Sequence, residues 1–220
     1  RSDSTKAKVA AIESYMANKT REGHFRIETS KLLYDYIDYG NAFATVDFEA
    51  SYIEDAHGQK VIDFIGPRLR RISPLDIVFN PLSNSFKDSF KIVRSLKTLG
   101  ELQIMAEDQP DNIYLKEALA KRAKMCAHMN AYGLEEGDKA EGFSMDGFGN
   151  YSEYLQSGYV ELLEFWGDIS DEGVMQRGKV VTIIDRMFVI RNAPMPSWAG
   201  SAPIFHTGWR TRPDNLWAMG

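Results

Sequence analysis

The sequence predicts an α+β fold in which a mainly antiparallel β-sheet is flanked by about four helices. Apolar residues recur at helical spacing over residues 1–40 and again over 97–130. By contrast, residues 41–96 and 158–220 contain runs in which apolar and polar residues alternate. Because helices and strands come in blocks and do not alternate one by one, the pattern favours antiparallel pairing over a parallel βαβ sheet.

Two helices are predicted in the first block, over residues 5–19 and 24–39. In each of them the apolar residues are three or four positions apart and therefore share one face. These residues are Val9, Ile12, Tyr15 and Met16 in the first helix, and Phe25, Leu32, Leu33, Tyr36 and Ile37 in the second. The second helix is expected to end at Tyr39-Gly40-Asn41, because glycine adopts the left-handed conformation of a helix end at little cost.

The second block is predicted to form strands. Apolar and polar side chains alternate over residues 44–52, so one face of this strand should be exposed to water. The apolar set is Ala44, Val46, Phe48, Ala50 and Tyr52, and the polar set is Thr45, Asp47, Glu49 and Ser51. Further extended segments are expected over residues 61–65, 69–72, 76–79 and 88–95, with Gly66-Pro67 interrupting the first two.

Two more helices are predicted over residues 98–107 and 112–129. Thr98 and Glu101 have the spacing of a capping box, in which each side chain accepts a hydrogen bond from the other residue's backbone amide. Asp111 is expected to cap the second of these helices.

The remaining segments are less regular. Residues 131–157 are rich in glycine and acidic residues and are interpreted as a long loop. Residues 159–166 are predicted to form a strand buried on both faces. Residues 179–191 should form two short strands joined near Asp185-Arg186, and residues 192–220 should be irregular.

The composition is that of an ordinary globular chain, interpreted here as one domain over residues 1–220. Of the 220 residues, 44% are hydrophobic and 26% are charged. The formal net charge of −5 argues against a surface that neutralises DNA phosphates along its whole extent. The single cysteine, Cys126, excludes a disulfide within the chain. No run of 18 apolar residues occurs, so we expect no membrane partner.

No catalytic, cofactor-binding or metal-binding residue is predicted. The glycines of residues 131–157 lack the Lys-Ser/Thr of a nucleotide-binding loop and lie among acidic residues that would repel phosphate. No two histidines lie within one helical turn of each other, so the spacing does not indicate a shared metal. The histidines are His24, His57, His128 and His206. The Gly-x-Ser-x-Gly motif of a nucleophilic serine is also absent from the sequence.

The residues themselves leave two classes of function open. A hydrolase could use paired carboxylates near the Gly-rich segment, since the chain has 31 acidic residues. A β-rich binding module of unrelated origin would also fit the composition. Glu161 and Glu164 are one carboxylate pair on a predicted strand, and we expect one of them to face water or an arginine.

Two groups of residues are candidates for contacts between subunits. The basic cluster Arg68, Arg70 and Arg71 could be a solvated edge, an inter-subunit ion pair or a nucleic-acid contact, and the acidic chain favours the ion pair over DNA. Trp198, Trp209 and Trp217 lie in the irregular C-terminal segment. They should pack either into the core or against another subunit, where aromatic residues concentrate.

Several segments in a fixed order resemble the portal proteins of tailed bacteriophages. They are Leu32–Phe43 (LLYDYIDYGNAF), Leu69–Pro81 (LRRISPLDIVFNP), Val160–Asp168 (VELLEFWGD), the stretch Pro194–Pro203, and Arg212–Gly220 (RPDNLWAMG). The similarity begins near residue 24 and covers most of the chain. It matches the wing domain of that family, and the chain ends where the first stem helix of a portal would begin.

The resemblance implies a structural role without catalytic residues or cofactors. Portals are homo-oligomeric rings, usually dodecameric, at one vertex of the capsid. They bind the packaging terminase, the capsid and tail or adaptor proteins, and double-stranded DNA passes through the channel without specific binding. The expected location is the virion, and the host cytoplasm during assembly. We expect this chain to be a fragment of a longer protein that does not close a stable ring by itself.

Overall fold

The structure is a computed structural model that describes residues 3–132, 151–171, 173–196 and 201–219. Helices and antiparallel strands are both abundant in these residues, so the predicted α+β class is confirmed. None of the described helices is both long and apolar enough to cross a bilayer.

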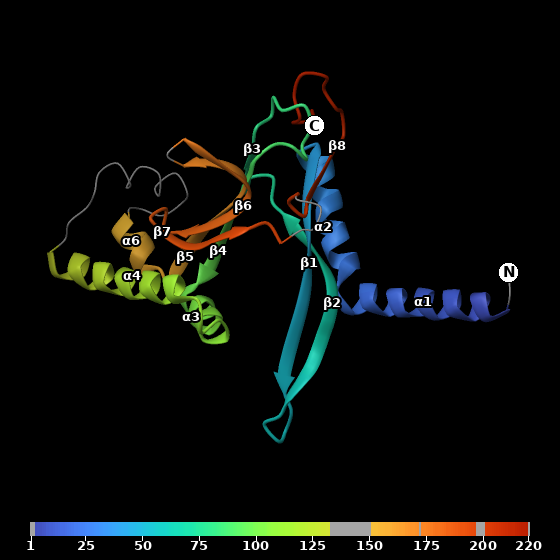
Figure 1. The fold of residues 1–220 in the computed structure, drawn as a ribbon, viewed down its shortest axis with the longest axis horizontal. Helices are drawn as coiled ribbons and strands as arrows, with labels where there is room; N and C mark the ends of the chain where they lie inside the picture. The colour runs from blue at the N-terminus through green and yellow to red at the C-terminus, as the bar shows by residue number, and fades with distance from the viewer. Residues whose placement is uncertain (1–2, 133–150, 172, 197–200, 220) are drawn as a thin grey trace. The chain divides into compact units, whose positions relative to one another are not determined.

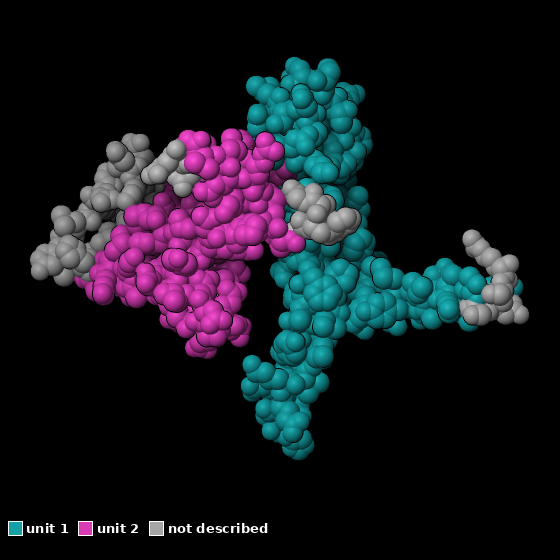
Figure 2. All heavy atoms as spheres, in the orientation of Figure 1, with its two compact units in different colours: residues 1–89, 201–220 teal, residues 90–200 magenta. Residues whose placement is uncertain are grey.

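The chain divides into two compact units (Figure 2). Unit 1 comprises Arg1–Ser89 and Ser201–Gly220, and unit 2 comprises Phe90–Gly200. Residues 1–220 were expected to form one domain, whereas the chain gathers into two compact units. Periodicity identifies the elements of a chain, but it does not determine which of them pack together.

Unit 1 is built on the sheet order β2-β1-β8, with β1 antiparallel to both neighbours (Figure 1). Its described elements are α1 (Asp3–Glu22), α2 (Phe25–Asp38), β1 (Asn41–Glu54), β2 (Lys60–Ile72), β3 (Ile77–Phe79) and β8 (Ile204–Gly208). Helix α2 lies over the face of the sheet that carries Ala42 and Ala44. Phe43 points to the opposite face, since side chains alternate along a strand. There it packs in an aromatic cluster, which consists of Phe43, Phe79, Phe86, His206 and Trp217.

Unit 2 contains the neighbouring antiparallel strands β4-β5-β6-β7. Its described elements are β4 (Lys91–Thr98), α3 (Leu99–Asp108), α4 (Ile113–Tyr132), α6 (Tyr151–Gln156), β5 (Tyr159–Asp171), β6 (Val174–Ile184) and β7 (Phe188–Pro194). Helices α3 and α4 pack on one face of these strands. The shared core is formed by Leu102, Ala106, Leu115, Ala118, Val160, Leu162, Ile184 and Ile190.

The four predicted helices occur as α1, α2, α3 and α4, within a few residues of the expected bounds. The capping box is confirmed, because Thr98 Oγ1 accepts from the Glu101 amide and Glu101 accepts from the Thr98 amide. Gly40 has a φ of 67°, which is the left-handed conformation expected after α2. The predicted cap at Asp111 is wrong. Asn112 Oδ1 accepts from the Leu115 amide at 3.1 Å, so the cap lies one residue later.

Three further predictions need correction. The segments 61–65 and 69–72 form one continuous strand, β2, through Gly66-Pro67. Proline is tolerated there because β2 is the last strand of the sheet order in unit 1. The predicted loop over 131–157 contains helix α6, while residues 133–150 lie outside the described residues. The C-terminal segment, predicted to be irregular, contributes β8, which pairs with β1.

Candidate functional site

Arg68 and Arg70 lie on the polar face of the β1–β2 hairpin, opposite the acidic residues of β1. The register pairs Asp47 with Arg68 and Thr45 with Arg70. Arg68 Nη1 is 3.2 Å from Glu49 Oε1, and Arg70 forms ion pairs with both Asp47 and Glu49. The alternation predicted for residues 44–52 therefore produces a ladder of opposite charges across two strands.

Arg71 points to the other face and joins β2 to α2. Its Nε and Nη2 atoms donate to Asp35 Oδ2 and Oδ1 at 2.5 and 2.7 Å. Its backbone amide donates to Glu28 Oε2 at 2.9 Å. The hydrogen bond with the buried Asp35 carboxylate raises the pKa of Arg71. All three arginines thus have acidic partners within their own chain, and Arg70 remains about half exposed, at 52%. A contact between subunits through these arginines stays a prediction.

Of the three tryptophans predicted for subunit contacts, the structure describes Trp209 and Trp217, which differ in their packing. Trp217 lies in the aromatic cluster, with its ring centroid 5.4 Å from that of Phe43 and 4.9 Å from that of Phe79. Trp209 packs on Tyr36 of α2 at 5.3 Å but remains 59% exposed. Trp198 lies outside the described residues. Trp217 therefore packs in the core of unit 1, whereas most of the Trp209 side chain is available for another contact.

Asn41 holds the C-terminal segment against β1. Its Nδ2 donates to the carbonyl oxygens of Tyr39 and Ala218, and its Oδ1 accepts from the Ala218 amide at 2.9 Å. These bonds fix the orientation of the amide, so His206 Nε2, 3.0 Å from Oδ1, must carry a proton. Burial lowers the pKa of His206, which favours the neutral ring stacked on Phe43.

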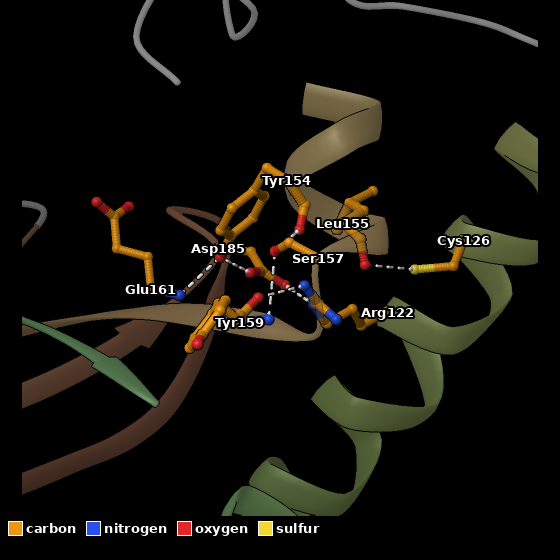
Figure 3. Close-up of polar contacts among 8 residues, drawn as sticks. All are labelled: Arg122, Cys126, Tyr154, Leu155, Ser157, Tyr159, Glu161 and Asp185. Carbon is orange, nitrogen blue, oxygen red and sulfur yellow. Dashed lines mark hydrogen bonds and ion pairs between the residues drawn. The ribbon is translucent and has the colours of Figure 1, made fainter. Parts of the chain in front are cut away.

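Unit 2 contains a buried polar cluster, shown in Figure 3, which we call the Asp185 cluster: Arg122, Tyr154 and Asp185. Arg122 Nε donates to Asp185 Oδ2 at 2.9 Å, and the Tyr154 hydroxyl donates to Asp185 Oδ1. The Tyr154 oxygen in turn accepts from the Glu161 amide at 2.6 Å. Arg122 also donates to the Tyr159 carbonyl at 2.8 Å. The cluster therefore joins α4, α6, β5 and the turn between β6 and β7.

The turn that presents Asp185 has an unusual backbone. Asp185 and Arg186 have φ values of 51° and 57°, and Met187 N–H donates to Ile184 O at 3.1 Å. A tight hairpin turn of this kind needs positive φ at both central residues, which glycine and asparagine adopt most easily. Contacts on both side chains hold the turn. Asp185 pairs with Arg122, and Arg186 donates to both carboxylate oxygens of Glu161 at 2.6 and 2.9 Å.

Glu161 is a separate buried carboxylate. Its side chain is 1% exposed and lies 2.9 Å from Arg94 Nε, in addition to its two bonds with Arg186. Figure 3 shows this side chain pointing away from Asp185. The expectation that Glu161 or Glu164 would face an arginine is confirmed for Glu161. Two arginines neutralise it, which suits a structural carboxylate better than a general acid or base.

The Asp185 cluster is closed to substrates in this conformation. Tyr154, Asp185 and Arg122 are 0%, 1% and 3% exposed. Burial raises the pKa of Asp185 despite the nearby Arg122, and burial together with Asp185 raises the pKa of Tyr154. Groups with shifted pKa values occur in active sites and also in structural ion pairs. Full burial and bonds to four elements indicate the structural role.

Within the described ranges, no group of three or more His, Cys, Asp or Glu side chains could hold a metal ion. The Gly-rich segment, where a hydrolase would have its carboxylates, falls largely on residues 133–150 and so lies outside the described residues. Unit 2 also has a hollow of about 550 Å³ beside α3, with Lys97, Gln109, Asn112 and Arg191 among its lining residues. Its size suits a small ligand, but its polar groups form no cluster with an evident chemistry.

The most unusual surface is the β1–β2 hairpin beyond its pairing with β8, which ends at Thr45. We call this part, residues 47–54 and 60–68, the ribbon. The register puts Phe48 opposite Pro67, Ala50 opposite Ile65, and Tyr52 opposite Ile62. These six side chains share one face, the apolar ribbon face, on which Phe48 is 75% exposed. Sequence alternation identified the apolar residues of β1 but not that they would stay uncovered.

Comparisons with known proteins add no relative: no protein-family model and no curated protein matches this sequence.

Proposed function

We propose that this chain is a structural subunit of a homo-oligomeric ring of the tailed-phage portal class. One observation supports an assembly role above all others. Of the thirty-two large apolar side chains exposed in the described residues, twenty-three belong to unit 1, which contains somewhat more than half of the described residues. Part of this set is contiguous, because the register places Phe48, Ala50 and Tyr52 beside Pro67, Ile65 and Ile62 on one face of the ribbon. Monomeric proteins rarely expose large contiguous apolar patches, and an exposed two-stranded ribbon needs a partner for stability.

The assignment to the portal class rests on the segments that resemble portal proteins in the same order along the sequence. On this proposal the complete ring stands at a capsid vertex of the virion, binds the packaging terminase, capsid and tail proteins, and assembles in the host cytoplasm. Double-stranded DNA passes through without specific binding, in agreement with a net charge of −5. Among the residues predicted to contact a neighbouring subunit, Arg70 and Trp209 are both more than half exposed and are therefore accessible to it.

The test is negative-stain electron microscopy of the complete polypeptide that contains this sequence. Rings with a central hole are expected. A uniform monomer that binds a glycan or peptide would instead favour the β-rich module, and saturable turnover of an ester or glycoside would favour the hydrolase. Either result, without rings, would overturn the portal proposal.

A further inference from the structure

Unit 1 carries a second apolar surface without a described partner, on the N-terminal helix. Val9, Ile12 and Tyr15 of α1 lie on one side of the helix at intervals of three residues and are 43%, 62% and 58% exposed. We call these three side chains the α1 stripe. Their spacing is that of a helix which lays one face into an apolar groove or onto an apolar sheet.

The α1 stripe cannot reach the apolar ribbon face of its own chain. The end of α1 meets the sheet, where Met16 and Lys19 line a small hollow with Val46, Leu69 and Pro67. Pro67 is the one residue of the apolar ribbon face in the lining of this hollow. His24, with a φ of 56°, forms the tight turn into α2, and a side chain at Gly23 would approach the Lys19 carbonyl oxygen to 3.0 Å. From this turn α1 leads away from the hairpin, and Figures 1 and 2 show α1 and the ribbon as separate projections of unit 1.

We infer that the α1 stripe of one copy packs on the apolar ribbon face of the next copy. Helix α2 already covers the same face of the sheet at Ala42 and Ala44. A second helix over Phe48 and Tyr52 would continue that layer. A second copy of this chain is the occupant because it carries both the α1 stripe and the ribbon face, and in the described residues the stripe does not pack on the ribbon face of its own chain.

A lysine on the side of the α1 stripe is complementary in charge to the acidic tip of the ribbon. The ribbon tip carries Glu54, Asp55 and Asp63 against the single Lys60. Lys8 lies on the side of α1 that carries Tyr15, because positions seven residues apart share one face of a helix. An apolar centre with opposite charges at its rim is the usual composition of a protein interface.

This contact joins two different surfaces, so it repeats head to tail until the rotation closes. The apolar area on each side is on the order of several hundred Å², below the roughly 800 Å² per partner of a stable interface. A single contact is therefore weak, and a closed ring gains its stability from repetition. The closure into a ring rests on the proposed function, whereas the contact itself does not.

A mixing experiment with the 220-residue chain tests the contact. The variants are Ile12→Asp, which disables the stripe, and Phe48→Asp, which disables the ribbon face. Each should abolish the concentration-dependent association of the wild type in sedimentation velocity. An equimolar mixture should then form one heterodimer, from the intact stripe of one variant and the intact ribbon of the other. Circular dichroism checks that both variants are folded.

Matched controls come from equally exposed apolar residues elsewhere. Ile104→Asp in α3 replaces a residue that is 60% exposed, and Leu75→Asp replaces one that is 75% exposed. Both should associate like the wild type. A wild type that stays monomeric up to about 1 mM, variants that still self-associate, or a mixture that stays monomeric would each overturn the inference.

The outcomes separate this contact from the portal proposal. Heterodimers in the mixture, with a wild type that stops at a closed dimer, support the contact and oppose the ring. Rings of the complete polypeptide that still form with Phe48→Asp support the ring and oppose the contact.

Discussion

Arg122 and Asp185 form an ion pair that is almost completely withdrawn from water. Arg122 Nε lies 2.9 Å from Asp185 Oδ2, and the two side chains are 3% and 0% exposed. The pair connects the middle of α4 to a hairpin turn sixty-three residues later. Such a pair contributes little net free energy compared with an apolar contact, but removal of one member leaves the other charge buried without compensation.

Asp185→Asn should therefore destabilise unit 2 by about 3–5 kcal/mol. Asparagine tolerates the left-handed backbone of residue 185, so the change removes the charge without adding backbone strain. Chemical unfolding followed by circular dichroism measures the loss. Glu117→Gln is the control, because Glu117 and Lys121 form a surface pair 3.8 Å apart whose members are more than half exposed. That change should cost less than about 0.5 kcal/mol, and equal losses for both variants would contradict the proposed role of burial.

His206 predicts a pH dependence of stability in unit 1. Burial lowers its folded pKa below the usual 6.5, so the unfolded chain binds a proton more readily than the folded chain. Its contribution to the stability is complete above pH 6.5 and is lost as the pH falls below that value. The midpoint temperature of thermal unfolding should be lower at pH 5.5 than at pH 7.5. This difference should be smaller in His206→Gln. An NMR titration that gives His206 a pKa of 6.5 or above would contradict the prediction.

The cap of α4 can be tested by two neighbouring substitutions. Asn112→Ala removes the acceptor of the Leu115 amide and should cost about 1 kcal/mol. Asp111→Ala should be nearly neutral, since the observed cap is Asn112. Unfolding curves of the two variants measured side by side give the answer. A larger loss of stability for Asp111→Ala than for Asn112→Ala would instead identify Asp111 as the cap, as the sequence pattern predicted.

Gly208 and Ala218 allow the C-terminal segment to lie against β8. A Cβ atom added at Gly208 would lie 2.4 Å from the Ala218 Cβ. Gly208→Ala should therefore displace the segment, expose Trp217 and cost roughly 1–3 kcal/mol. Tryptophan fluorescence should shift to the red, and the double variant Gly208→Ala/Ala218→Gly should reverse much of the shift. Gly100→Ala is the control, since nothing lies within 4 Å of its added Cβ in α3. A double variant as perturbed as the single one would show that this contact is not responsible.

The sequence alone determined the elements whose signals are local. Helical spacing gave α1 to α4, and the spacing of Thr98 and Glu101 gave the capping box that is observed. Alternation gave the two faces of β1, and the pair of strands joined near Asp185 and Arg186 was also predicted correctly. These features depend on residues a few positions apart, whose geometry the backbone fixes.

Tertiary structure decided how those elements combine. The bonds of Arg122 to Asp185 and of Asn41 to Ala218 join residues 63 and 177 positions apart, and no local pattern encodes such distances. The strand β8 depends on β1 for its pairing, so its own residues gave no signal. The same holds for the apolar ribbon face. Alternation shows that Phe48 and Tyr52 share a side, but only the packed chain shows that α2 covers the beginning of that side and leaves the rest exposed, because burial depends on what else in the molecule comes to lie there.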